Sequence, residues 1–96
     1  MLIIVETFRQ DGEQSGSQIR VRPVTGQGFS PKMRVECSKA MRTAHPVGQL
    51  FLLEVTRKSK EDGPDFLYSY YGDSWTPVTR REAEAFITST FRKRRK

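Results

Sequence analysis

The sequence predicts an α+β fold with a mostly antiparallel curled sheet or small open barrel of about five strands. A C-terminal helix packs on this sheet, and a short helical turn precedes the central strand. Alternating and β-branched runs recur along the chain, one amphipathic helix follows them, and helices do not alternate regularly with strands. The 96 residues allow one core. We therefore place a single domain at residues 1–91 and a basic tail at 92–96.

The N-terminal half supplies three predicted strands. Residues 2–9 are rich in β-branched side chains, and residues 18–24 alternate between apolar and basic ones. Pro23 cannot donate a hydrogen bond to a neighbouring strand, so it belongs at a sheet edge or a strand end. Residues 32–38 alternate again, after a glycine-containing loop at 25–31.

The segment before Pro46 has two interpretations. Ser30 and Pro31 suit the N-cap and first position of a helix over residues 31–44. The alternation favours instead a strand that ends at residue 37, followed by a short helical turn at 39–44. Pro46 ends either element, because a proline restricts the preceding residue to extended conformations.

Residues 49–71 carry the most apolar run and half of the aromatic side chains. We expect a central β-hairpin here. Its first strand, 49–57, is apolar on both faces through Leu53, which is typical of a strand covered on both sides. A polar loop at 58–65 and an aromatic strand at 66–71 complete the predicted hairpin.

The C-terminal helix has the clearest local signal. Thr79 and Glu82 form a T-x-x-E capping box, in which each residue satisfies a backbone amide at the helix start. One stripe of side chains then follows at helical spacing and is expected to face the sheet. It consists of Ala83, Phe86, Ile87, Thr90 and Phe91.

The composition indicates a protein of a reducing, intracellular compartment, which we expect to be the cytoplasm. The single cysteine, Cys37, excludes an internal disulfide framework. No apolar run approaches the roughly 20 residues of a spanning helix, and Met1 is not followed by the pattern of a secretory signal. No membrane association is therefore expected.

The net charge of +6 is unevenly distributed. The last five residues are all basic, and the rest of the chain is near neutral, yet residues 14–53 hold six basic side chains and one acidic one. If strands 18–24 and 32–38 pair as a hairpin, basic side chains gather on one outer face, where they repel each other. Phosphate groups would relieve that repulsion, although an alternating charge pattern is also typical of a solvated face.

We therefore predict a non-enzymatic domain that binds DNA or RNA through phosphate contacts. The predicted basic face consists of Arg20, Arg22, Lys32, Arg34, Lys39 and Arg42. The predicted tail contacts are Arg92, Lys93, Arg94, Arg95 and Lys96. Candidate stacking surfaces for bases are Tyr68, Tyr70, Tyr71 and Trp75. The alternative is a protein-interaction or accessory module, monomeric or homodimeric, that uses the exposed aromatic residues at the end of the hairpin.

Residue counts disfavour catalysis and metal binding. His45 and Cys37 fall short of the four ligands of a structural zinc site, and no third residue is marked out to orient a Cys–His nucleophile pair. We expect Cys37 in the core and His45 at the surface or as a cap. Gly26 and Gly28 lack the lysine and helix of a phosphate-binding loop. The sequence thus predicts no catalytic residue, no metal and no cofactor.

Overall fold

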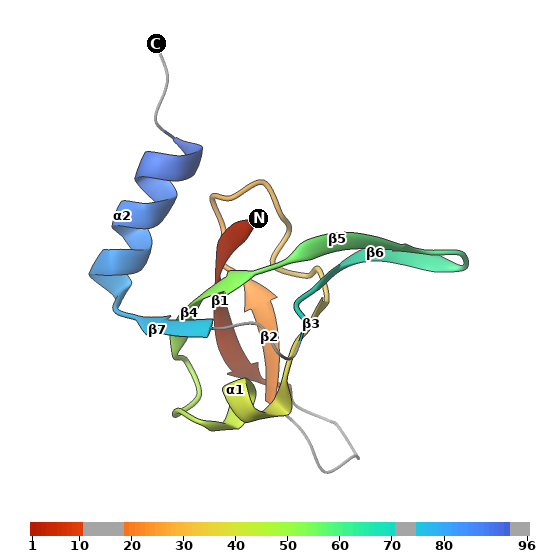
Figure 1. Cartoon of the computed structure of the whole chain (residues 1–96), viewed down its shortest axis with the longest axis horizontal. Helices are drawn as coiled ribbons and strands as arrows, with labels where there is room; N and C mark the ends of the chain where they lie inside the picture. Colours follow the sequence, from red (N-terminus) through yellow and green to blue (C-terminus); the bar gives the residue numbers. More distant parts are fainter. Residues whose placement is uncertain (11–18, 71–74, 93–96) are drawn as a thin grey trace.

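A computed structural model describes residues 1–10, 19–70 and 75–92 (Figure 1). An antiparallel four-stranded sheet has the order β2-β1-β4-β7, and a second, three-stranded sheet has the order β3-β6-β5. The strands of the first sheet are β1 (Leu2–Arg9), β2 (Ile19–Pro23), β4 (Leu50–Glu54) and β7 (Trp75–Val78). Those of the second are β3 (Val35–Glu36), β5 (Thr56–Lys60) and β6 (Gly63–Tyr68). The helices are α1 (Lys39–Thr43) and α2 (Arg80–Phe91).

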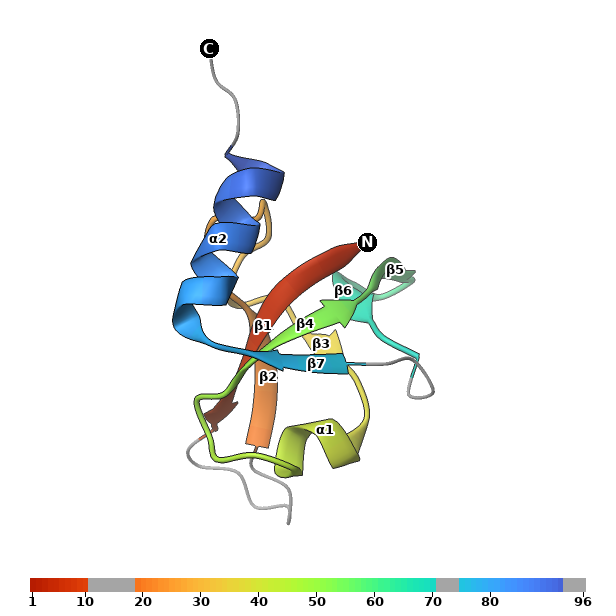
Figure 2. The ribbon, with the colours of Figure 1, turned by 60° about the vertical axis from the view of Figure 1, so that its left-hand side comes forward.

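The α+β class, the antiparallel sheet and the C-terminal helix are confirmed. The prediction of one curled sheet or open barrel is not, because the described strands divide between two sheets. Figure 2 shows α2, the first sheet and the second sheet side by side in that order. β5, whose side chains are all exposed, pairs with β6 and with no strand of the first sheet.

The centre of the first sheet is apolar on both faces. Val5 of β1 lies opposite Phe51 of β4 on one face, and Ile4 lies opposite Leu52 on the other. β4 is therefore covered on both sides, as its sequence predicts.

Helix α2 begins at the predicted capping box. The amide of Glu82 donates to the Thr79 hydroxyl (3.1 Å), and the amide of Thr79 donates to a carboxylate oxygen of Glu82 (2.8 Å). Ala83 and Ile87 are buried against Ile4 of the sheet. Burial of a side chain such as Ile87 contributes about 1.5–3 kcal/mol, which anchors the helix to this face.

The larger core lies on the opposite face of the first sheet. Phe51 and Leu53 of β4 form a buried cluster with Leu67 of β6, Val35 of β3 and Met41 of α1. These side chains are at most 8% exposed. The cluster therefore joins the two sheets and α1 into one body.

The predicted hairpin at 49–71 is wrong in its pairing. β4 belongs to the first sheet, and after the buried Val55 the chain continues into β5, which pairs with β6. Most of residues 58–65, expected as a loop, form these two strands, and the turn between them is Glu61 and Asp62. Every side chain of β5 is exposed, so the polarity that suggested a loop belongs to a ribbon that projects from the body (Figure 1).

The predicted strands 18–24 and 32–38, which would have placed the basic side chains on one face if they paired as a hairpin, do not pair with each other either. β2 pairs with β1, whereas β3 pairs in parallel with β6, with Val35 opposite Leu67. Apolar alternation identifies the buried face of a strand but not its neighbour, and Val35 finds its burial against β6. β2 is an edge strand with Pro23 as its last residue, as expected.

The short helix before the central strand is confirmed, and the alternative of one helix over 31–44 is wrong. α1 begins after Ser38, whose hydroxyl accepts a hydrogen bond from the amide of Met41 (3.1 Å). This contact is a typical N-cap. The sequence did not predict β7, in which Pro77 occupies an edge strand where a missing backbone donor is tolerated.

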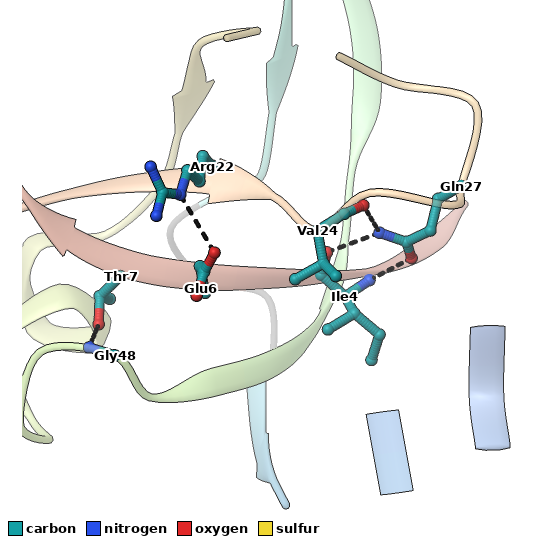
Figure 3. Close-up of polar contacts among 7 residues, drawn as sticks. All are labelled: Ile4, Glu6, Thr7, Arg22, Val24, Gln27 and Gly48. Atoms are coloured by element: carbon teal, nitrogen blue, oxygen red, sulfur yellow. Dashed lines mark hydrogen bonds and ion pairs between the residues drawn. The ribbon is translucent and has the colours of Figure 1, made fainter. Parts of the chain in front are cut away.

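Gln27 fixes the loop that follows β2 (Figure 3). Its side-chain oxygen accepts from the amide of Ile4 (2.6 Å), and its side-chain nitrogen donates to the carbonyls of Ile4 and Val24 (both 2.8 Å). The carboxamide is buried and takes the place of one rung of the β1–β2 ladder. It thereby ties the start of the loop to the first sheet.

Candidate functional site

A cavity of about 880 Å³ lies between β2 and residues 31–37. Five cationic side chains line it, and all five belong to the basic face predicted from the sequence. They are Arg20, Arg22, Lys32, Arg34 and Arg42. We call this cavity the cationic groove. The residues meet although their strands do not pair, because the loop held by Gln27 carries the chain back past the free edge of β2.

Strand β2 supplies one wall of the cationic groove. Arg20 lies opposite Phe8 of β1, and Arg22 lies opposite Glu6, so all four side chains share one face of the sheet. Arg22 Nε donates to a carboxylate oxygen of Glu6 (3.1 Å), and its guanidinium lies 4.5 Å from the centre of the Phe8 ring (Figure 3 shows the ion pair). These contacts hold Arg22 extended along the sheet.

Residues 31–37 supply the other wall. A turn precedes it, in which the amides of Lys32 and Met33 donate to the hydroxyl and the carbonyl of Ser30 (both 3.0 Å). Lys32 and Arg34 are exposed on this wall. Arg34 Nε lies 3.3 Å from a carboxylate oxygen of Glu36, and such an exposed pair contributes at most about 1 kcal/mol. Arg34 is therefore available to a stronger anionic ligand.

Arg42 of α1 connects the two walls. Its Nη1 donates to the carbonyl of Ile19 (3.1 Å) at the beginning of β2, while its buried Nε has no hydrogen-bond partner among the described residues. Cys37 lies nearby and also lines the groove. Burial raises the pKa of the Cys37 thiol to about 11, and the Arg42 cation opposes this only in part. The thiol is therefore protonated at neutral pH, which argues against a nucleophilic role.

The cationic groove has an excess of positive charge. Its lining contains five cations and one carboxylate, that of Glu36, and Glu6 adds a second carboxylate through its pair with Arg22. A smaller cavity of about 440 Å³ near the start of α2 holds Arg80 together with Glu82 and is balanced. Among the described residues, the cationic groove thus differs from the smaller cavity in having more cations than carboxylates in its lining.

The other predicted cations lie elsewhere. Lys39 is exposed at the first position of α1 and does not line the cavity. Arg92 caps the end of α2 and donates to the Thr88 hydroxyl (3.3 Å). Lys93, Arg94, Arg95 and Lys96 lie outside the described residues, as does Tyr71.

Trp75 and His45 have packing roles. The Trp75 ring is half-buried and meets Phe51 edge to face, with 5.5 Å between the ring centres. The His45 ring packs against both, at 5.5 Å from Phe51 and 6.3 Å from Trp75. His45, expected at the surface or as a cap, is thus half-buried in an aromatic cluster.

The tyrosines of β6 have a different environment from Trp75. Tyr68 is half-buried, and Tyr70 is 53% exposed. Phe66, which was not among the predicted stacking residues, shares a strand face with Tyr68. The ammonium of Lys58 lies 5.6 Å from the centre of the Tyr68 ring, and that of Lys60 lies 5.3 Å from the centre of the Phe66 ring. Lys58 and Lys60 alternate along β5 and contact the aromatic rings of β6. This alternation would have pointed to Phe66, but it can be recognised only if residues 58–60 are assigned to a strand.

The described residues contain no group of three or more His, Cys, Asp or Glu side chains that could hold a metal ion. Within the same residues, no helix has the length and apolar character needed to cross a membrane. Comparisons with protein families, with curated proteins and with solved structures find no match to this chain.

Proposed function

We propose that this protein binds nucleic acid, with the phosphates of the strand in the cationic groove. The observation that carries the proposal is the convergence of five cations from β2, residues 31–34 and α1 on one cavity. All five cations lie within residues 20–42, but they belong to three separate segments. The fold of these segments therefore brings together cations that do not form a continuous basic run.

The chemistry of the lining suits phosphate. Four of the five cations are arginines, whose planar guanidinium groups can donate two hydrogen bonds to one phosphate. A polyanion with evenly spaced phosphates could contact several of these cations at once. Binding to the nucleic-acid backbone also releases counterions, which makes such a groove effective at low salt.

Removal of two groove cations tests the proposal. The double variant Arg20→Gln/Lys32→Gln should bind a fluorescein-labelled 15-mer oligonucleotide at least about tenfold more weakly than the wild type in anisotropy titrations at low salt. The matched control is Arg80→Gln/Arg81→Gln, which changes the net charge equally at exposed positions outside the groove.

The control should retain wild-type affinity, and both variants should unfold at the wild-type urea concentration. Equal losses in the two variants would show general attraction to a basic protein and would contradict a groove site. The alternative of a protein-interaction module gains less support, because Trp75, one of the residues on which it rested, packs against Phe51 and His45.

A further inference from the structure

We infer that the outer face of the second sheet is a stacking platform for bases, so that the protein selects single-stranded over duplex nucleic acid. This inference rests on the proposed function, because the platform would extend the cationic groove. The inference concerns aromatic side chains that are not part of the buried core on either face of the first sheet. Phe66 and Tyr68 of β6 belong to neither of the two buried clusters.

Strand alternation places both rings on the face that points away from the core. Leu67, between them, is fully buried in the cluster that joins the two sheets, and Ser69 is 3% exposed. Phe66 and Tyr68 therefore project from the opposite, outer face. Tyr70, 53% exposed, follows at the same two-residue spacing.

Cations flank these rings on both neighbouring strands. On β5, Lys58 lies opposite Phe66, and its ammonium reaches the Tyr68 ring. On the other side, β3 pairs in parallel with β6, with Glu36 opposite Tyr68. Arg34 pairs with Glu36 on the same outer face, and one step earlier in this register it lies beside Phe66. The face thus has aromatic rings at its centre, lysines at the β5 margin and the Arg34–Glu36 ion pair at the β3 margin.

Arg34 makes the platform continuous with the cationic groove. It belongs to the groove lining and also to the margin of the outer face. A nucleic-acid strand whose phosphates occupy the groove would therefore have its next bases beside the Phe66 ring. This continuity, together with the lysines of the β5 margin, points to a nucleic-acid strand as the occupant.

The spacing of the rings favours a single strand. Side chains two residues apart on a strand are about 6.6–6.8 Å apart. This is about twice the 3.4 Å rise of stacked bases, so one base can lie on each ring only if the strand is unstacked. A duplex buries the faces of its bases and cannot offer them to the rings.

The two lysines do not block this use of the rings. Their cation–π contacts are of the exposed, weak kind, and stacking of a base on an aromatic ring is stronger. A base that displaces Lys58 or Lys60 also frees an ammonium to contact the adjacent phosphate. The lysines would therefore cover the rings in the free protein and pair with phosphate in the complex.

Affinities for three ligands of equal length test the inference: a single-stranded oligothymidylate, the same backbone without bases, and a duplex. The full-length chain should bind the base-bearing single strand most tightly. Phe66→Leu and Tyr68→Leu should each weaken that binding at least about fivefold and leave binding of the abasic strand unchanged. Phe86→Leu, which removes a half-buried ring at α2, is the matched control and should bind all three ligands as the wild type does.

The leucines keep an apolar side chain, and urea unfolding checks that each variant is folded. Unchanged affinity of the double variant Phe66→Leu/Tyr68→Leu for the base-bearing strand would overturn the platform, as would equal wild-type affinity for base-bearing and abasic strands. In either case, a loss of binding in Arg20→Gln/Lys32→Gln would still support the groove. If the wild type bound none of the three ligands, the proposed function itself would fall.

Discussion

Replacement of Gln27 by leucine should destabilise the fold by about 2–3 kcal/mol, because three hydrogen bonds of a buried carboxamide disappear together. The carbonyl of Ile4 keeps a second donor, the amide of Val24 (3.0 Å). The carbonyl of Val24 is only partly buried and can bond to water. The amide of Ile4 is buried and would be left without an acceptor, and this group carries most of the penalty.

The change can be measured by urea unfolding, followed by the fluorescence of Trp75, the single tryptophan. Gln10→Leu is the matched control, because Gln10 is exposed directly after β1, and its replacement should alter the unfolding free energy by less than about 0.5 kcal/mol. Gln27→Glu should also destabilise the protein at neutral pH, since a carboxylate would face two carbonyl oxygens. A Gln27→Leu variant as stable as Gln10→Leu would refute the role assigned to the carboxamide.

Two further predictions concern pH and helix capping. Because the pKa of Cys37 is raised from 9.0 to about 11 in the folded protein, the unfolded chain loses its thiol proton first as the pH rises. Stability should therefore fall between pH 9 and 11 more steeply in the wild type than in Cys37→Ala, and identical slopes would contradict this. Thr79→Ala should lower the unfolding free energy by about 1 kcal/mol through loss of the capping box. Thr90→Ala, on the exposed part of α2, should change it by less than about 0.5 kcal/mol, and equal effects would argue against the cap.

The elements predicted correctly are those whose signals are local. The capping box at Thr79, the β-branched run of β1 and the proline after α1 each act within a few residues, so the sequence alone indicates them. The two-sided burial of β4 was also predictable, because its apolar run has no polar face.

The pairing of strands was not predictable in the same way. The polar run of β5 resembles a loop because a projecting ribbon is held by backbone hydrogen bonds and needs few apolar side chains. The parallel pairing of β3 with β6 joins distant segments, and alternation cannot specify it. The basic residues of the candidate site were selected by their types, yet the cavity that unites them depends on the loop fixed by Gln27, a residue without any sequence signal.

The salt dependence of oligonucleotide binding tests the central claim most directly. A plot of the logarithm of the association constant against that of the salt concentration should be less steep for Arg20→Gln/Lys32→Gln than for the wild type, by about 0.7 for each phosphate of a single strand that the variant no longer neutralises. Arg80→Gln/Arg81→Gln should keep the wild-type slope. A groove variant whose slope equals that of the wild type would contradict the claim that phosphates occupy the cationic groove.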